Sequence, residues 1–525
     1  MIRSRALPCD GALIASTRVA EPCAERTKRF VLAATIVGSG MAFIDGAVVG
    51  VALPVIGSDL EASLPTMQWV LNAYVLASAA LTLIGGAAGD RFGRKRVFIA
   101  GIVLFTLASV ACGLARGAIP LIAGRIAQGI GGAFMVPNSL AIIGASFGEH
   151  EKGKAIGTWA AATSIAGALG PVVGGWLTDM ISWRAIFYIN VPFAVLGVLL
   201  AWVHVPESGD PLASPRLDWA GAVLAASGLA ALAFALIEAS ELGWRDPAVG
   251  LAGAAGVVGL GMFLWVETRS AVPMVPLGLF RSSRFSGINL LTLLLYGALS
   301  GGFFLVPFDL IRVQSYTAAE AGAAMLPFPL VMIALSRWSG GLLDRFGARL
   351  PLIVGSLITA AGLALFAISG LGGRYWLVVL PPLLIMGFGM TVSVAPLTAA
   401  VMSAVPDRQI GVASGVNNAI ADIASLLAVA AFGAVGFAVF ANALDAALGS
   451  LGLVPEMSQA LGAIKQTLAG TDLPATLSDD ARVALRSAIS TAFADSFRVL
   501  MLAAAALAAL SAACAAATIP REAPS

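Results

Sequence analysis

The sequence predicts an all-α, polytopic membrane protein with about fourteen transmembrane helices. Of its 525 residues, 59% are hydrophobic and 11% are charged, whereas an ordinary soluble domain has roughly 25% charged residues. The mean hydropathy is +0.92. The apolar residues come in runs long enough to cross about 30 Å of hydrocarbon at about 1.5 Å per residue. We therefore expect the chain to be embedded in a lipid bilayer.

Apolar runs separated by glycine, proline or charged residues define the expected spans. We expect them near residues 30–55, 66–88, 97–115, 119–146, 155–178, 185–205, 217–240, 249–266, 286–310, 321–343, 350–370, 375–403, 410–441 and 496–518.

The basic residues between the spans predict the orientation. Cytoplasmic loops carry an excess of Lys and Arg, and the loops on the side of the two termini hold most of them. We therefore expect a multi-pass protein of the cell inner membrane with both termini cytoplasmic. No apolar core with a cleavage site precedes the first span, so we interpret residues 1–29 as a cytoplasmic tail and not as a signal peptide. The basic residues on that side are Arg91, Arg94, Lys95, Arg96, Lys152, Lys154, Arg216, Arg269, Arg281, Arg284, Arg345, Arg349 and Arg408.

Charge and cysteine content argue against several functional classes. A net charge of +2 gives no basic field that would collect nucleic acid. The cysteines, at positions 9, 23, 112 and 514, form no CxxC pattern and have no histidine nearby, so neither a disulfide framework nor a zinc site is indicated. We expect no metal and no cofactor.

Two apparent catalytic patterns also fail on inspection. Residues 148–155 resemble a phosphate-binding loop, but the loop ends in Ala155, which cannot bind magnesium, and no strand precedes it. His150 and His204 are the two histidines, and both flank inner loops, so no Ser-His-Asp arrangement is plausible. We expect no enzyme activity and no catalytic residues.

An internal repeat divides the chain. Residues 86–95 join the second and third spans, and residues 340–349 repeat the pattern between the tenth and eleventh. Two six-helix halves would repeat a turn six helices later, whereas here it recurs eight helices later, so an extra helix pair is expected between two six-helix bundles. The expected domains are a tail 1–29, an N-terminal bundle 30–205, an inserted helix pair with linkers 206–285, a C-terminal bundle 286–518 that includes an extracytoplasmic loop 442–495, and a tail 519–525.

The repeated turn has a mechanical logic beyond topology. Small residues allow close helix approach, a glycine permits a tight reversal, and basic side chains hold the loop at the anionic membrane face. The acidic residue can accept hydrogen bonds from a neighbouring helix end or Arg. A plain positive-inside loop is the alternative. The conformational residues assigned here are Gly86, Asp90, Arg91, Gly93, Arg94 and Lys95, with Asp344, Arg345 and Gly347 in the second copy.

Residues 86–95 resemble the G-x-x-x-D-R-x-G-R-K motif of the major facilitator superfamily. Three further segments, 44–54, 125–133 and 170–175, are similar to motifs of its fourteen-helix drug:proton antiporter branch. Ala47 and Gly50 depart from that branch, where Thr and Asn are usual, and Ala348 replaces an Arg in the second loop. The resemblance implies a major-facilitator fold and proton-driven export of small hydrophobic or amphipathic compounds such as drugs or antibiotics.

Asp45 is the most informative charged residue. A carboxylate at mid-span costs about 2.5 to 3.5 kcal/mol on insertion scales, so it should face a cavity or a partner. Arg125 lies at a depth compatible with pairing, and Gln128 follows one turn later. We assign proton coupling to these three residues; a structural ion pair is the alternative.

Two further features of the spans are candidates. Asp422 is a deep carboxylate of the second half, and it either binds a cationic substrate group or a second proton, or neutralises Arg337. In the fifth span, small residues beside a proline suit a helix that deforms during alternating access, with tight static packing as the alternative. The latter residues are Gly170, Pro171, Gly174 and Gly175.

The sequence thus predicts a proton-coupled efflux transporter. The expected partners are a small-molecule substrate and the lipid bilayer, with no nucleic acid, and the energy source is a proton gradient. An exporter dedicated to one endogenous metabolite and a membrane sensor that transports nothing are the alternative functions. Whether a periplasmic adaptor protein takes part is left open by the sequence.

Overall fold

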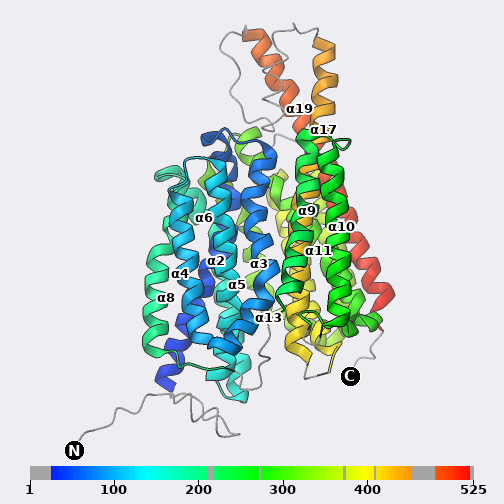
Figure 1. Ribbon diagram of the computed structural model, residues 1–525. Coiled ribbons are helices and arrows are strands. Elements are labelled where there is room, and N and C mark those ends of the chain that lie inside the picture. Colours follow the sequence, from blue (N-terminus) through cyan, green and yellow to red (C-terminus); the bar gives the residue numbers. More distant parts are fainter. Residues whose placement is uncertain are drawn as a thin grey trace, which may run out of the picture.

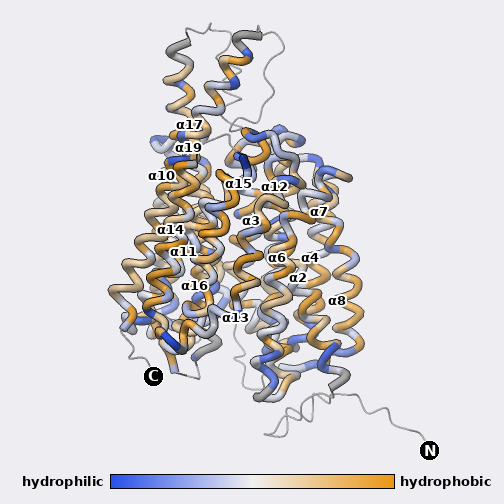
Figure 2. Tube along the Cα trace, turned by 180° about the vertical axis from the view of Figure 1, so that it is seen from behind, coloured by the Kyte–Doolittle hydropathy of each residue, from blue (hydrophilic) through white to orange (hydrophobic). Residues whose placement is uncertain are grey.

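The computed structural model describes residues 25–209, 218–270, 273–369, 374–406, 409–451 and 479–520. These residues form helices and connecting turns, with no strand among them, and 14 helical segments are long and apolar enough to cross a membrane. The helices stand side by side in one upright bundle (Figure 1). Hydrophobic residues cover the middle of the bundle and hydrophilic residues gather at its two ends (Figure 2). The predicted fold class is confirmed.

The N-terminal half contains the first six spans. Its last span is divided, because a short helix at one end is followed by a longer one. The helices are α2 (Glu25–Asp59), α3 (Leu64–Phe92), α4 (Arg94–Gly113), α5 (Ala118–Ser146), α6 (Glu149–Met180), α7 (Ala185–Tyr188) and α8 (Asn190–His204).

An inserted pair and the C-terminal half follow. The pair consists of α9 (Trp219–Leu242) and α10 (Pro247–Arg269), and the short 3-10 helix η1 (Leu277–Arg281) leads into the second half. That half contains α11 (Ser283–Phe308), the π-helical turn η2 (Asp309–Val313), α12 (Ala318–Met325), α13 (Pro327–Phe346), α14 (Arg349–Ser369), α15 (Tyr375–Val378), α16 (Leu380–Ser403), α17 (Ile410–Leu451) and α19 (Asp479–Thr518).

The last two spans are longer than hydropathy predicts. α17 has 42 residues, roughly 60 Å at about 1.5 Å per residue, or twice the hydrocarbon thickness. Both α17 and α19 rise above the rest of the bundle (Figure 1). The expected loop 442–495 is therefore partly a continuation of these two helices, because a helix does not need apolar side chains once it has left the bilayer. The middle of that loop, like the two tails, lies outside the described residues.

Glycines let particular helices approach closely. A Cβ at Gly85 of α3 would collide with the backbone of Ala133 in α5, and a Cβ at Gly89 would collide with the Asn138 side chain. These two glycines bring α3 and α5 together. A Cβ at Gly86 would meet Pro137 at an ordinary 3.7 Å, so Gly86 is not required for this contact.

The inserted pair lies beside the seam between the halves. α9 packs against α10, and it also packs against α3 of the first half and α17 of the second. Trp69 of α3 donates a hydrogen bond from Nε1 to Oε1 of Glu238 in α9 at 3.1 Å. One side of the seam is therefore covered by α9.

The two halves contact each other at the end of the bundle away from the termini. α2 begins and α19 ends at the same end of the bundle (Figure 1), called the termini end below. At the opposite end, Arg312 of η2 donates to the Pro54 carbonyl of α2, and Gly175 of α6 lies against the Ala318 carbonyl of α12. Toward the termini end, a Cβ on Gly157 of α6 or Gly340 of α13 would meet nothing within 4 Å.

Candidate functional site

Asp45 and Arg125 form a buried ion pair between α2 and α5. Each side chain is 1% exposed, and Arg125 Nη1 donates to Asp45 Oδ2. Gln128 lies one turn along α5, so it shares a face with Arg125. Its Nε2 donates to Asp45 Oδ1 at 3.0 Å, and its Oε1 accepts from Arg125 Nη1 at 2.9 Å. The three residues assigned to proton coupling therefore meet at one point.

Two neutral residues that the sequence analysis missed complete this site. Asn190 at the start of α8 donates from Nδ2 to Asp45 Oδ1 at 3.2 Å and to Ser109 Oγ at 2.9 Å. Ser109 of α4 also accepts from Gln128 Nε2 at 3.1 Å and donates to the Phe187 carbonyl at 2.8 Å. We call Asp45, Arg125, Gln128, Asn190 and Ser109 the polar cluster. It joins α2, α4, α5 and α8 inside the N-terminal half.

The Arg125 guanidinium is satisfied on its other sides as well. Its Nε donates to the Val70 carbonyl at 3.0 Å, and its Cζ lies 4.4 Å from the ring centroid of Tyr74, a cation–π contact. Both residues belong to α3. A buried charge with this many partners is held in a single geometry, and the loss of Asp45 or Arg125 would leave the other charge uncompensated.

Asp422 has a different environment. It lies partly buried in α17 within electrostatic range of Tyr74 and Tyr296. Among the described residues, no ion pair joins it to Arg337, whose side chain is exposed on α13. The structure thus does not bring these two residues together. Asp422 faces the tyrosines near the middle of the bundle.

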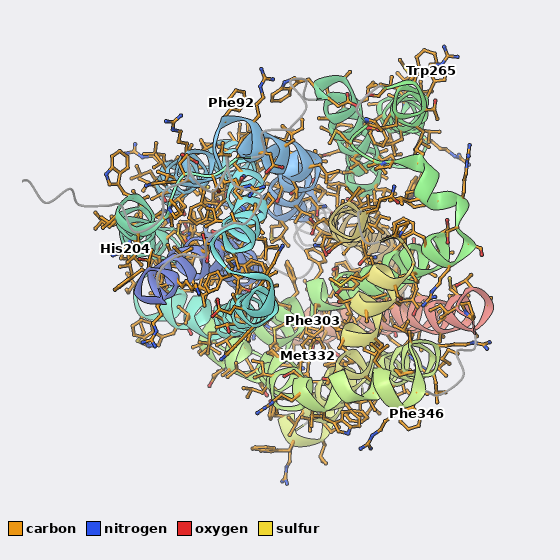
Figure 3. The ribbon with its side chains drawn as sticks, turned by 90° about the horizontal axis from the view of Figure 1, so that it is seen from below. Phe92, His204, Trp265, Phe303, Met332 and Phe346 are labelled. Carbon is orange, nitrogen blue, oxygen red and sulfur yellow. The ribbon has the colours of Figure 1, made fainter. Side chains whose placement is uncertain are left out.

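A cavity of about 430 Å³ lies between the two halves. Its walls are almost entirely carbon, with three phenylalanines from the second half. Seen from the termini end, Phe303 lies toward the centre, between the halves (Figure 3). Ala47 and Gly50, the positions that depart from the usual motif, are part of the wall. The lining is Gly46, Ala47, Gly50, Val51, Leu71, Asn72, Val75, Gly167, Ala168, Pro171, Ser300, Phe303, Phe304, Pro307, Met325, Phe328, Pro329, Ser425 and Val429.

The glycines of α6 are packed against both halves. A Cβ at Gly170 would press on Ala47 of α2, and one at Gly174 would press on Val48. Gly175 faces α12 of the other half, and the carbonyl of Pro171 lies against Gly322 there. Because Pro171 also lines the cavity, this stretch of α6 connects the cavity wall to the end at which the halves meet.

The two copies of the repeated turn both contain a glycine with a positive φ, but they differ in their side chains. Gly93 has φ 102° and Gly347 has φ 64°, both in the region that favours glycine. Asp90 accepts from Arg94 Nε at 2.9 Å, within its own loop. The position equivalent to Arg94 in the second copy is Ala348. Phe92 and Phe346, which are equivalent, lie far apart on the rim of the bundle (Figure 3).

The other residues assigned to the turn lie mostly at the surface. Arg91 and Arg345 have exposed side chains, and the Asp344 side chain lies outside the described residues. Lys95 is the second residue of α4, and it donates its backbone N–H to Glu207 Oε1 at 3.1 Å. Glu207, which comes after α8, was not found from the sequence because the two segments are far apart along the chain.

A family model described as Major Facilitator Superfamily matches residues 35–429. The chain belongs to the major facilitator superfamily. Among curated relatives, the multidrug resistance protein Stp of Mycobacterium tuberculosis (strain CDC 1551 / Oshkosh) is 35% identical over 83% of this chain and 79% of its own length. The tetracenomycin C resistance and export protein of Streptomyces glaucescens is 33% identical over 77% of this chain and 74% of its own. The methylenomycin A resistance protein of Bacillus subtilis (strain 168) is 34% identical over 77% of this chain and 87% of its own length.

Solved structures of major facilitator proteins share the fold. A bacterial homologue of the human lysosomal transporter Spinster, in an inward-facing and unoccupied conformation, matches with a TM-score of 0.64 at 17% identity and covers 96% of this chain and 100% of that one. The xylose transporter XylE of E. coli, in an inward-open conformation, matches with a TM-score of 0.57 at 15% identity, over 94% and 97%. By sequence the chain is thus a drug-efflux type of major facilitator protein, and the solved structures show the same fold.

Proposed function

We propose that this protein is a proton-coupled antiporter that exports small hydrophobic or amphipathic compounds across the inner membrane. The observation that carries the proposal is the buried Asp45–Arg125 pair beside an apolar cavity. Relatives at 33% to 35% identity are named for multidrug resistance or for export of one antibiotic, which supports export as the direction. We further infer that the termini end faces the cytoplasm, because basic residues gather in its loops.

The proposed cycle uses the two ends of the seam in turn. The cycle begins with the halves open toward the cytoplasm, so that a compound enters the cavity from that side while Asp45 is ionised and paired with Arg125. Opening of the opposite end then lets a proton reach Asp45 as the compound leaves. The protonated, uncharged site returns and releases its proton to the cytoplasm.

Asp45 is suited to this role because its charge depends on Arg125. Ionised, it accepts from Arg125, Gln128 and Asn190. A movement of α5 relative to α2 that lengthens the contact to the guanidinium removes the strongest reason for the carboxylate to stay ionised. Proton uptake and helix movement are coupled through this one contact.

The test is an Asp45→Asn variant in inverted membrane vesicles that carry a pH gradient and no other energy source. We expect it to lose concentrative uptake of ethidium, while binding of ethidium to the purified variant persists. Asp246→Asn is the matched control, since Asp246 is the N-cap of α10 and Asn caps equally well. The proposal is wrong if Asp45→Asn still concentrates ethidium when a pH difference alone is supplied.

The same vesicles separate the alternatives. A sensor that transports nothing would show no proton flux when a compound is added, as measured with a pH-sensitive dye. An exporter dedicated to one metabolite would respond to one member of a substrate panel, whereas a multidrug exporter would respond to many. The cavity wall is mostly apolar and has few polar groups, which favours a broad range of substrates.

A further inference from the structure

Asn72 of α3 is unusual among the buried asparagines of the N-terminal half. It is 1% exposed, and its Nδ2 has no hydrogen-bond partner among the described residues. By contrast, Nδ2 of Asn138 donates to two carbonyls and Nδ2 of Asn190 donates to Asp45 and Ser109. Buried amide groups are normally paired, so a buried donor without a partner calls for an explanation.

Asn72 also lines the cavity between the halves. Its neighbours there on α3, Leu71 and Val75, are apolar, and the facing wall carries Phe303, Phe304 and Phe328. Among the described residues that form this wall, none is charged. The amide of Asn72 is therefore the largest polar side-chain group in a mostly apolar wall, which also carries the hydroxyls of Ser300 and Ser425.

The cost of an unpaired amide can be recovered by a ligand. A compound that enters the cavity displaces any water that solvates the amide. A compound with an acceptor oxygen restores the lost hydrogen bond, whereas a pure hydrocarbon does not. A site built in this way discriminates by the presence of the acceptor, because the unpaired group is left behind when the acceptor is missing.

We propose that Asn72 is a specificity-determining residue that donates a hydrogen bond to a carbonyl oxygen of an uncharged aromatic compound held against the phenylalanine wall. The inference rests on the proposed export function, since it names the class of compound that the cavity takes. Asn72 selects for the carbonyl group. The aromatic rings of Phe303, Phe304 and Phe328 pack against the flat, apolar rest of the compound.

The test compares 9-fluorenone with fluorene, which share a tricyclic carbon framework and differ by the carbonyl oxygen. Binding is measured by equilibrium dialysis of the purified full-length protein in detergent, against the same micelles without protein. The wild type should bind the ketone more tightly than the hydrocarbon, on the order of 5-fold for one neutral hydrogen bond.

Asn72→Leu, which has a similar volume and no donor, should bind the two compounds equally. Its affinity for fluorene should stay unchanged. Asn72→Ala provides a second variant that lacks the amide donor, in case the leucine variant does not fold. Asn417→Leu is the control for an asparagine lost elsewhere, because Asn417 donates to Asn289 and Thr292 away from this cavity; it should keep the preference for the ketone.

Three results would overturn the proposal. They are a wild type that binds the ketone no better than the hydrocarbon, an Asn72 variant that keeps the preference, and an Asn72 variant that loses both compounds to the same degree, which would indicate a role in cavity shape. Dialysis needs no proton gradient, so these results are independent of the vesicle test. If the vesicles show no pH-driven export while the purified protein still prefers the ketone, the proposed antiport is refuted and the proposal for Asn72 is not.

Discussion

The two halves repeat one loop but differ in the chemistry of their interiors. In the N-terminal half, Asp45 is neutralised by Arg125 and enclosed by neutral hydrogen-bonding groups. In the C-terminal half, Asp422 lies near tyrosines, with no ion pair among the described residues. The first arrangement suits a charge that is exchanged within the protein. The second suits a charge that is available to a ligand.

The largest expected effect is on the buried pair of the N-terminal half. Arg125→Leu leaves the Asp45 carboxylate uncompensated, which should lower the free energy of unfolding by about 3 to 5 kcal/mol and abolish pH-driven export. Thermal unfolding of the purified protein, followed by circular dichroism, measures the first effect. The double variant Asp45→Asn/Arg125→Leu should recover much of the stability. If the Arg125→Leu variant is as stable as the wild type, the ion pair is not needed for the stability of the N-terminal half.

The two loop copies should differ in sensitivity. Asp90→Asn should reduce export at least 10-fold while membrane insertion stays normal, because we expect loss of the Asp90–Arg94 contact to shift the balance between the conformations of the transporter. Asp344→Asn should cost less, since Ala348 stands where the first copy has the Arg94 partner. Initial rates in vesicles, normalised to the amount of inserted protein, give the comparison. Equal losses in the two variants would show that the Asp90–Arg94 contact is irrelevant.

Asp422 provides a more selective test of the C-terminal half. Asp422→Asn should reduce export of the cation ethidium by roughly 5- to 10-fold, or about 1 to 1.4 kcal/mol, because Asn keeps an acceptor oxygen and loses the charge. It should spare neutral compounds. Competition between ethidium and 9-fluorenone in the vesicles reports both classes at once. An equal reduction for both would assign Asp422 to structure or to proton transfer.

The smallest expected effect concerns the neutral members of the polar cluster. Ser109→Ala removes the hydroxyl that joins Gln128, Asn190 and the Phe187 carbonyl, which should lower the free energy of unfolding by about 1 kcal/mol. Ser511→Ala in the C-terminal half is the matched control, because Ser511 bonds only to the Ala508 carbonyl of its own helix. If the two variants are equally stable, the cluster adds nothing beyond its ion pair.

The charged part of the site could be predicted from the sequence, and the neutral part could not. A carboxylate and a guanidinium stand out in apolar spans because burying them is costly, and this identified Asp45 and Arg125. Asn190 and Ser109 are ordinary in such spans, and their contacts join residues 81 apart along the chain. Only the fold shows that they meet.

The sequence predicted how deep a residue lies in its span better than it predicted which side of the helix the residue faces. Neutralisation of Arg337 was one of the roles considered for Asp422, yet α13 turns Arg337 to the surface. Hydropathy likewise located all fourteen spans but not the ends of α17 and α19, because it reports apolar density and does not detect where a helix stops.

The contact between α6 and α12 sets how the end away from the termini can open. Asp179 of α6 accepts from the backbone N–H groups of Ala318 and Ala319, at 3.2 and 2.7 Å, so one half caps a helix of the other. α12 also carries its own capping box, Thr317 with Glu320. When the halves part, the capping box keeps α12 helical, and the two released N–H groups face the medium. Small anions can then compete with Asp179 for that helix end, so the dwell time of the open state should respond to the salt outside the cell.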